Sequence, residues 1–463
     1  MRIGSLPGHP STPSGVTVDS GAPASNRALT GVEWLVCIVA GLGFAFDLYE
    51  SLMTALIVGP SLVSLGGLTP GTPDFNLWVG LFFFVPVVTG GICGLLGGYL
   101  TDIFGRRRVL VWSILLYSVS AAAAAYATSL TALLLLRCAT LAGVCVEAVA
   151  AVAWIAELFP APERREKVLG YTQACYPVGG ILVSGAYYVA VTYGHLLPEI
   201  RGAHDAWRYT LLSGLIPALP LIVLRPFLPE SPLWRSQRSA GTVRRPRVGE
   251  LFLPDLRGRT IAIVLAAACT LAIPYAALQH TPRIVPGIVE RSVTSAREVQ
   301  QMVSAVFLVQ EVGSVAGRLL FASLVLRIVN RRRLLRIFLI PALAVFSWVF
   351  FFAARDGLLA FAAGVFCAQA LFNGLHSFWG NYLPRMFPTR LRGTGESLAM
   401  NLGGRVMAVT AAMVTTQLSN VVPASDPAMR FAFAAGTTAV VVLVGGLVIS
   451  RWLAEPEGAH LPD

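Results

Sequence analysis

The chain has 463 residues, of which 55% are hydrophobic and only 13% charged, and its formal net charge is +11 at pH 7. A soluble protein of this length would carry about a quarter charged residues, whereas the apolar residues here come in blocks long enough to span a bilayer. The composition therefore excludes an ordinary soluble protein and predicts an all-α polytopic membrane protein. We expect its basic charge to orient it in the lipid bilayer, with no nucleic-acid partner.

Residues 1–30 are rich in Gly, Pro, Ser and Thr, which predicts a disordered cytoplasmic tail. Residues 31–228 are expected to form one six-helix bundle, 229–258 a basic cytoplasmic linker, 259–453 a second six-helix bundle, and 454–463 a second cytoplasmic tail. The twelve predicted spans are 32–56, 78–101, 109–127, 131–156, 168–192, 208–228, 259–280, 300–327, 334–353, 357–383, 393–419 and 428–453.

The distribution of Lys and Arg predicts the orientation of these helices. If both termini lie inside, the five cytoplasmic loops hold 18 of these residues and the six external loops only five, namely Arg201, Arg283, Arg291, Arg297 and Arg355. Cationic residues favour the cytoplasmic side, so both termini are predicted to be cytoplasmic. The dominance of arginine hints at a bacterial inner membrane.

Several kinds of site are missing from the sequence. The single lysine, Lys167, follows Glu166, so the chain has no Gly-Lys-Ser/Thr loop for ATP phosphates. The seven cysteines lie inside hydrophobic blocks without paired spacing, and the six histidines form no His-x-x-x-His pair. We therefore predict no enzymatic site, no metal and no cofactor, so that any pumping must use an ion gradient or the gradient of the substrate.

Two landmarks recur about half a chain apart. The stretch from Gly97 to Arg108 contains Asp102, Gly105, Arg106 and Arg107, and Asn330-Arg331-Arg332-Arg333 is a degraded copy with Arg327 in the place of Asp102. Likewise, Glu157-Leu158-Phe159-Pro160 recurs as Arg385-Met386-Phe387-Pro388. Such repeats indicate a duplicated transporter, whose substrate site lies between the two halves near the membrane midplane.

The stretch from Gly97 to Arg108 resembles the Gly-x-Leu-x-Asp-x-x-Gly-Arg-Arg signature of the major facilitator superfamily. Two further elements resemble its metabolite:proton symporter and sugar-porter-like branches, Pro229-Glu230-Ser231-Pro232-Leu233-Trp234 and Phe46-Asp47-Leu48-Tyr49, the latter shared with aromatic-acid symporters. The resemblance implies twelve transmembrane helices in two pseudo-symmetric bundles and alternating access. It also implies a gate of charged residues at the inner helix ends. The gating candidates are Gly98, Asp102, Gly105, Arg106, Arg107, Glu157, Arg164 and Glu230, with Asp102 and Arg106 expected to pair across the two halves.

Asp47 is the acid most suited to carry a proton, because it lies near the middle of the first span, where a charge is costly unless paired or hydrated. Arg137 in the fourth span lies at a similar depth and is its expected partner. Separation of such a pair would couple protonation to transport, as the resembling symporters do; the alternative is a permanent salt bridge. Glu147 and Glu311 are further intramembrane acids and join Asp47 and Arg137 as proton-coupling candidates.

Polar and aromatic residues of five spans are candidates to contact substrate. Gln369, Asn373 and His376 recur at four and three residues and share one helix face, as do Asn401 and Arg405. Arg405 could meet an anionic substrate. The full set is Glu50, Gln173, Tyr176, Tyr275, Gln279, Gln369, Asn373, His376, Trp379, Asn401 and Arg405. For each, the alternative is a hydrogen bond between helices.

The sequence therefore predicts a secondary active transporter, with its partners being a small-molecule substrate, protons and the lipid bilayer, and with a monomeric chain. An organic acid moved by proton symport is favoured. A sugar or other metabolite carried by symport or uniport, proton-driven drug efflux and a non-transporting sensor are the alternatives.

Overall fold

In the computed structural model of the chain, the described residues are 30–159, 164, 168–169, 171–172, 174–224, 229–230, 235, 248–289, 295–325, 327–387, 391–424 and 426–456. The predicted N-terminal tail and most of the linker lie outside them. The described chain is built from helices, with one isolated bridge between Ile200 and Ala203.

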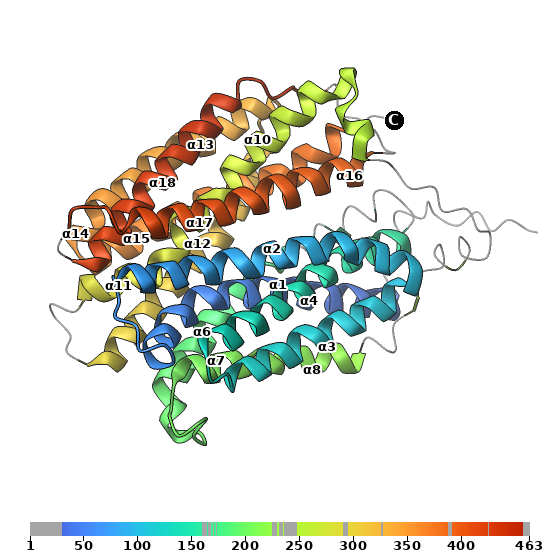
Figure 1. Ribbon diagram of the computed structural model, residues 1–463. Helices are drawn as coiled ribbons and strands as arrows, with labels where there is room; N and C mark the ends of the chain where they lie inside the picture. Colours follow the sequence, from blue (N-terminus) through green and yellow to red (C-terminus); the bar gives the residue numbers. More distant parts are fainter. Residues whose placement is uncertain are drawn as a thin grey trace, which may run out of the picture.

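The helices form two layers that follow the two halves of the sequence (Figure 1). The N-terminal layer contains α1 (Gly31–Ser64), α2 (Pro73–Phe104), α3 (Arg106–Ala125), α4 (Leu130–Leu158), α6 (Val178–Tyr193), η1 (Gly194–Leu196), α7 (Ala206–Ser213) and α8 (Leu215–Leu224). The C-terminal layer contains η3 (Val248–Phe252), α10 (Pro254–Ala276), η4 (Leu278–His280), α11 (Thr281–Val289), α12 (Ala296–Val325), α13 (Arg331–Trp348), η5 (Val349–Ala353), α14 (Ala354–Asp356), α15 (Leu358–Tyr382), η6 (Leu383–Arg385), α16 (Arg392–Ser397), η7 (Leu398–Arg405), α17 (Val406–Leu418) and α18 (Pro427–Ile449).

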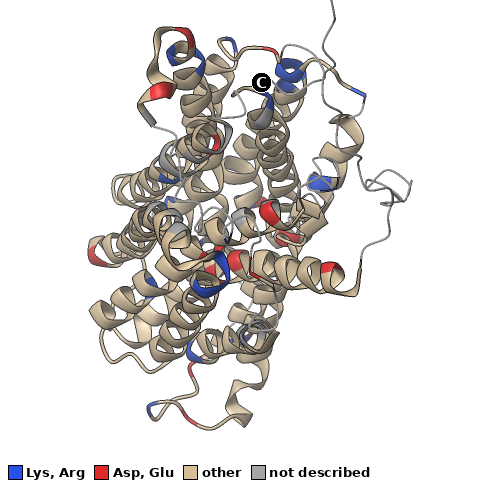
Figure 2. Cartoon of the chain, turned by 90° about the vertical axis from the view of Figure 1, so that its right-hand side faces the viewer, with Lys and Arg blue, Asp and Glu red and all other residues tan. Residues whose placement is uncertain are grey.

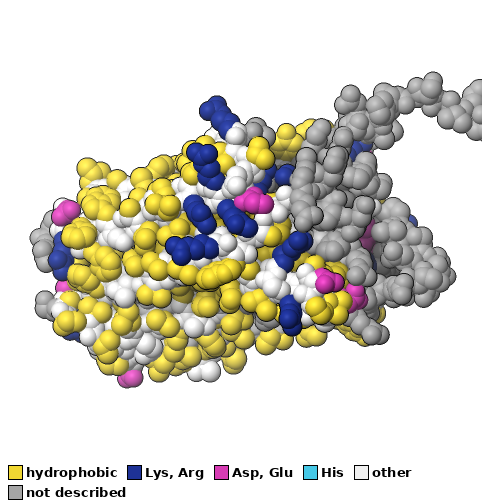
Figure 3. Space-filling model, turned by 90° about the horizontal axis from the view of Figure 1, so that it is seen from above, with side chains coloured by type: hydrophobic (Ala, Val, Ile, Leu, Met, Phe, Trp, Pro, Cys, Tyr) yellow, Lys and Arg dark blue, Asp and Glu magenta, His cyan; other side chains and the backbone are white. Residues whose placement is uncertain are grey.

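Ten of the described helical segments are long and apolar enough to cross a membrane, which agrees with ten of the predicted spans. The predicted fifth and sixth spans appear as the shorter α6 and the pair α7 and α8. Hydrophobic side chains cover most of the outer face of the C-terminal layer, with Lys and Arg gathered over part of it (Figure 3). Such a surface suits contact with lipid, because lipid tails accept apolar side chains and reject charges.

We call the end of the molecule at which the C-terminus is marked the termini end, and the opposite end, at which α14 lies, the far end (Figure 1). Seen from the termini end, most helices run toward the viewer and charged residues are a small minority among them (Figure 2). At this end Gly105 joins α2 to α3 with φ of 92°, a conformation that favours glycine, and the sharp turn starts α3 at Arg106.

The seventh predicted span, 259–280, is too short. It continues through a break at Ala277 into α11, so the segment runs from Pro254 to Val289. Arg283, which was assigned to an external loop, lies in α11 with only 9% of its surface exposed. Pro282, the second residue of α11, costs no backbone hydrogen bond, whereas Pro286 lies inside the helix and removes one.

Glycine contacts set how closely neighbouring helices approach. A methyl group built on Gly313 or Gly317 of α12 would overlap the backbone of α15, and one built on Gly90 of α2 would overlap Cys145 of α4. These stripes are therefore packing surfaces. They bring α2 and α4 together in one half and α12 and α15 in the other.

Candidate functional site

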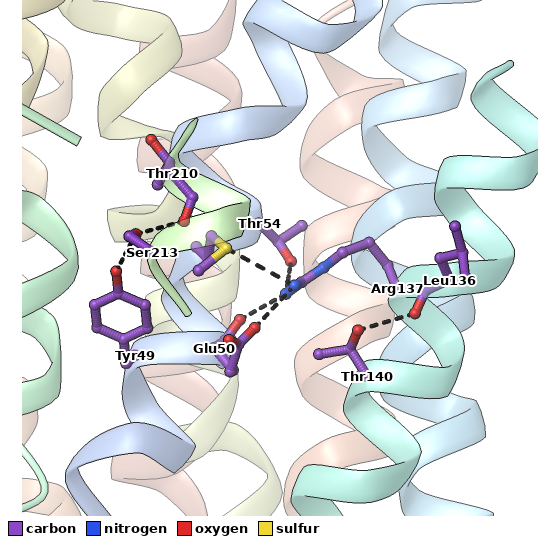
Figure 4. Close-up of polar contacts among 9 residues, drawn as sticks. Tyr49, Glu50, Thr54, Leu136, Arg137, Thr140, Thr210 and Ser213 are labelled. Atoms are coloured by element: carbon purple, nitrogen blue, oxygen red, sulfur yellow. Dashed lines mark hydrogen bonds and ion pairs between the residues drawn. The ribbon is translucent and has the colours of Figure 1, made fainter. Parts of the chain in front are cut away.

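The most completely paired charge in the interior is Arg137 of α4, and its partner is Glu50 of α1 (Figure 4). The guanidinium donates to Glu50 Oε2 at 3.1 Å, to the Glu50 carbonyl at 2.6 Å and to Thr54 Oγ1 at 3.0 Å. Arg137 is 0% and Glu50 1% exposed. The expected pairing of Arg137 with Asp47 is thus wrong, and Glu50 belongs to a closed structural network.

The error has a physical cause. Asp47 and Glu50 lie within one turn of α1, so depth along the helix cannot choose between them. The choice comes from Thr54, one turn beyond Glu50 on the same helix face, which supplies a second acceptor for the same guanidinium. The spacing of Glu50 and Thr54 was the sequence signal for this pairing.

Asp47 instead lies near one charge from the other half of the chain and one from its own half. It lies within electrostatic reach of Arg405 in η7 and of Glu147 in α4. Arg405 donates to Cys145 Sγ at 2.8 Å, so this C-terminal side chain touches an N-terminal helix two residues before Glu147 in the sequence. The π-helical turns of η7 place Arg405 at this contact. A cation from one half therefore lies near the Asp47 carboxylate of the other half, and Glu147 lies near the same carboxylate.

A second buried acid lies in α12, surrounded by amides. Glu311 Oε1 accepts from Gln369 Nε2 at 3.1 Å and from Gln310 Nε2 at 3.3 Å, and the residue is 0% exposed. Its other oxygen is buried without a hydrogen-bond partner among the described residues. That oxygen lies against Gly180 of α6, where a methyl group would overlap it. Glu311 is therefore enclosed at the contact between the two halves.

Two parallel rings and a cation mark another part of this contact. The ring of Tyr176, just before α6, is stacked with that of His376 in α15 at a centroid distance of 6.3 Å and an interplanar angle of 6°. The Arg318 guanidinium of α12 lies 5.6 Å from the Tyr176 ring centroid. Arg318 was absent from the sequence candidates, although an arginine seven residues after Glu311 in an apolar span was a visible signal.

The remaining substrate candidates fall into different environments. Gln369, Asn373 and Trp379 are buried in the C-terminal half, where Asn373 Nδ2 donates to the Gln369 carbonyl and Trp379 Nε1 to Thr270 Oγ1. On the face that Gln369 and Asn373 share with His376, both amide nitrogens therefore donate to protein atoms, while Gln369 Oε1 is buried without a hydrogen-bond partner among the described residues. Tyr275 of α10 lies within electrostatic reach of Arg405, and Gln279 is buried in η4. Gln173 and the side chain of Asn401 lie outside the described part of the chain.

The termini end of the N-terminal half carries a charge cluster. Arg106 forms an ion pair with Glu157 of α4 at 2.8 Å. Glu230 Oε1 accepts from the backbone N–H groups of Arg106 and Arg107, as expected for an anion at a helix N-terminus. Arg164 pairs with Glu33 at 2.9 Å. The Arg106–Glu157 pair lies within one half, and the side chain of Asp102 is outside the described part, so the expected pairing across the halves stays a prediction.

The C-terminal half repeats this cluster with Glu455 in the role of Glu230. Glu455 accepts from the backbone N–H groups of Arg331 and Arg332, at 2.9 and 2.8 Å. The carbonyl before each acid is also bonded, Pro229 by Trp154 Nε1 and Ala454 by Tyr382 Oη. Arg385 stands where the first half has Glu157, and the Arg331 guanidinium donates to backbone carbonyls at Val325 and Ile328. The duplication therefore extends to the residues after each sixth helix.

Among the described residues, no group of three or more His, Cys, Asp or Glu side chains is placed to hold a metal ion. What the interior does hold is a line of opposed charges and rings between two helical halves in a chain of membrane-crossing helices. This is the architecture of a two-bundle membrane transporter. The model of the Major Facilitator Superfamily matches residues 34–412, and the chain belongs to that superfamily.

Relatives in this superfamily include carriers of acids and of sugars. The chain is 28% identical over 368 residues to a probable 4-methylmuconolactone transporter of Cupriavidus pinatubonensis, covering 78% of each chain. It is 24% identical over 363 residues to a 3-(3-hydroxy-phenyl)propionate transporter of Escherichia coli, covering 76% of this chain and 81% of that one. An arabinose-proton symporter of Bacillus subtilis is 25% identical over 219 residues, covering 47% and 44%.

Solved structures show the same fold. A D-xylose-proton symporter superposes with a TM-score of 0.72 at 18% identity, covering 92% of this chain and 98% of that one. The chain is therefore a non-enzymatic integral membrane transporter with the major facilitator fold, as the sequence predicts.

Proposed function

We propose that the chain is a proton-coupled symporter of a small organic acid, working by alternating access. The observation that carries the proposal is Arg405, a C-terminal cation held at Cys145 within electrostatic reach of Asp47 in the N-terminal half, where Glu147 lies near the same Asp47. A cation between the halves is available to a substrate carboxylate, and the acids opposite it are available to protons. The relatives named for 4-methylmuconolactone and 3-(3-hydroxy-phenyl)propionate support an organic acid as the substrate.

The proposed coupling is a competition for Arg405. Without substrate, the guanidinium compensates the ionised carboxylates of Asp47 and Glu147. When a substrate carboxylate pairs with Arg405, one of these carboxylates loses its compensating charge and takes up a proton, because an uncompensated buried charge is costly. The anion and the proton then cross together, and departure of the anion returns Arg405 to the acid and expels the proton.

The buried Glu50–Arg137 network gives Asp47 this freedom. Because Arg137 is occupied by three oxygen acceptors, it does not hold Asp47 in a permanent salt bridge. Asp47 is also less buried than Glu50, as a group that exchanges protons with water must be. We assign Asp47 as the first proton carrier, with Glu147 beside it.

The gate is proposed to lie at the termini end, with the termini in the cytoplasm of a bacterial cell. Polar contacts between the halves occur at the far end, as with Asn76 Nδ2 and Asn420 Oδ1 at 2.5 Å, and at mid-depth, as with Ser304 Oγ and the Ser184 carbonyl at 2.8 Å. With the predicted orientation, this state is closed toward the outside. Arg106, Glu157 and Glu230 would then rearrange when the termini end closes.

Sugar symport is the second candidate, and the likeness to the arabinose-proton symporter favours it. Sugars are held by many neutral hydrogen-bonding groups. In this chain Gln369, Asn373 and Trp379 are committed to protein contacts, so the charged centre favours an acid.

The test uses the purified chain in proteoliposomes that contain a pH dye. Organic acids, sugars and amino acids are screened for internal acidification in the wild type, in Asp47→Asn and in Asp74→Asn. Asp74 lies exposed at the start of α2 and serves as the matched control. Acidification by organic acids that Asp47→Asn abolishes and Asp74→Asn leaves intact is expected. Uptake of label without acidification, unchanged by Asp47→Asn, refutes proton coupling; binding without uptake identifies a sensor.

A further inference from the structure

One stripe of α12 faces the N-terminal half along its whole length. Arg297, Ser304, Glu311 and Arg318 are each seven residues apart, which is about two helical turns or roughly 10.5 Å. Arg297 donates to the Thr192 carbonyl, Ser304 to the Ser184 carbonyl, and Glu311 lies against Gly180. Arg318, the fourth residue of the stripe, lies over the ring of Tyr176 from the N-terminal half. It therefore lies at the contact between the halves and not toward lipid.

Arg318 carries a positive charge that no acid compensates among the described residues. It has no ion pair there, and its Nε atom is buried without a hydrogen-bond partner. Its neighbours are the ring of Tyr176 and, within electrostatic reach, His376. A ring face stabilises a guanidinium only weakly, whereas an anion neutralises its charge and also accepts its hydrogen bonds. This half-buried guanidinium is thus prepared to bind an anion.

Arg318 and Arg405 approach one aromatic group from different elements. Tyr176 lies within electrostatic reach of both arginines, one in α12 and the other in η7. The parallel rings of Tyr176 and His376 add flat apolar surface at the same place. Arg405 lies near the Asp47 carboxylate, whereas Arg318 lies near the rings of Tyr176 and His376. The two cations therefore offer two distinct positions for anionic groups.

We propose that Arg318, with Tyr176 and His376, is a second anion-binding point for a planar substrate with two carboxylates. This inference rests on the proposed function, in which Arg405 takes the first carboxylate. The second carboxylate pairs with the Arg318 guanidinium, and the flat carbon frame between the two carboxylates lies against the rings. Arg318 then selects dicarboxylates over monocarboxylates, and Arg405 is required for both.

Benzoate and terephthalate test this selection, because the two flat acids differ by one carboxylate. Their uptake into proteoliposomes is measured for the wild type, Arg318→Gln, Arg318→Lys and Arg405→Gln. Arg327→Gln is the matched control, since Arg327 is exposed just beyond α12. Loss of a hydrogen-bonded charge pair costs about 1.5–3 kcal/mol. Arg318→Gln is therefore expected to raise KM for terephthalate by roughly tenfold to a hundredfold, with benzoate uptake nearly unchanged and terephthalate uptake partly restored in Arg318→Lys.

Retained benzoate uptake also shows that Arg318→Gln folds. An equal loss of both acids in Arg318→Gln but not in Arg318→Lys, or no effect on either acid, overturns the second anion-binding point and leaves proton symport intact. If Arg318→Gln fails to fold, Arg318→Lys decides: an unchanged ratio of terephthalate to benzoate KM overturns the inference. A wild type that moves no organic acid at all fails the proposed function itself, and this inference with it.

Discussion

Glu50 and Asp47 are three residues apart on α1, and the structure predicts opposite consequences for their removal. Glu50→Gln leaves the Arg137 guanidinium buried without its carboxylate, although its bonds to the Glu50 carbonyl and Thr54 can persist. At 3.1 Å and an effective dielectric constant of about 20, the lost Coulomb energy is about 5 kcal/mol, partly offset by the desolvation of Glu50. Breaking such a pair typically costs about 3–5 kcal/mol.

Thermal unfolding in detergent, followed by tryptophan fluorescence, measures this cost. By the size scaling of soluble domains, the Tm of Glu50→Gln is expected to fall by roughly 3–5 °C, and that of Asp47→Asn by much less. The double variant Glu50→Gln, Arg137→Met should recover part of the loss, because no buried charge remains unpaired. Proton coupling per transported acid should survive in Glu50→Gln. The assignment of the two acids fails if Asp47→Asn is the destabilised variant, or if Glu50→Gln uncouples transport at an unchanged Tm.

Three further outcomes follow from single contacts. Gly180→Ala places a methyl group against Glu311 Oε2 and should slow uptake severalfold. Gly185→Ala is the control, because the space around Gly185 is open, and it should not slow uptake. Equal uptake in both variants would show that close packing at Gly180 does not matter for transport. Glu455→Gln removes the anion at the N-terminus of α13 and should lower stability by about 0.5–2 kcal/mol, as Glu230→Gln does for α3; an unchanged Tm in Glu455→Gln speaks against the repeated cap. Arg106→Gln breaks the pair with Glu157 and should change the uptake rate more than KM, and a change confined to KM contradicts a gating role.

The sequence predicts the fold well because lipid imposes simple rules on it. Apolar blocks of bilayer length and the bias of cationic residues between loops are both visible without a structure. Irregular helices are the part that these rules miss. The break at Ala277, the π-helical turns at η5 and η7 and the extension through α11 arise from packing between helices, which leaves no periodic signal in the chain.

The sequence predicts which residues belong to the candidate site better than it predicts which acid pairs with which arginine. The sequence identifies its candidates because polar groups in apolar spans are energetically costly and usually have a function, as with Asp47, Tyr176, His376 and Arg405. Which acid meets which arginine depends on rotation about each helix axis, and one turn of error exchanges Asp47 for Glu50. Gln369 and Asn373 show the reverse problem, because a shared polar face can point toward protein as easily as toward a cavity.

The duplication gives the two halves the same helix caps although they differ in charge. Each half fixes the start of its third helix with a carboxylate from the chain after its sixth helix, Glu230 in one case and Glu455 in the other. These caps act within a half and need no partner across the interface. The Arg106–Glu157 pair has lost its counterpart in the second half, where Arg385 replaces the acid. The helix starts at the termini end can therefore stay ordered while, in the proposed mechanism, the contacts between the halves at Arg405, Glu311 and Arg318 change with substrate and proton.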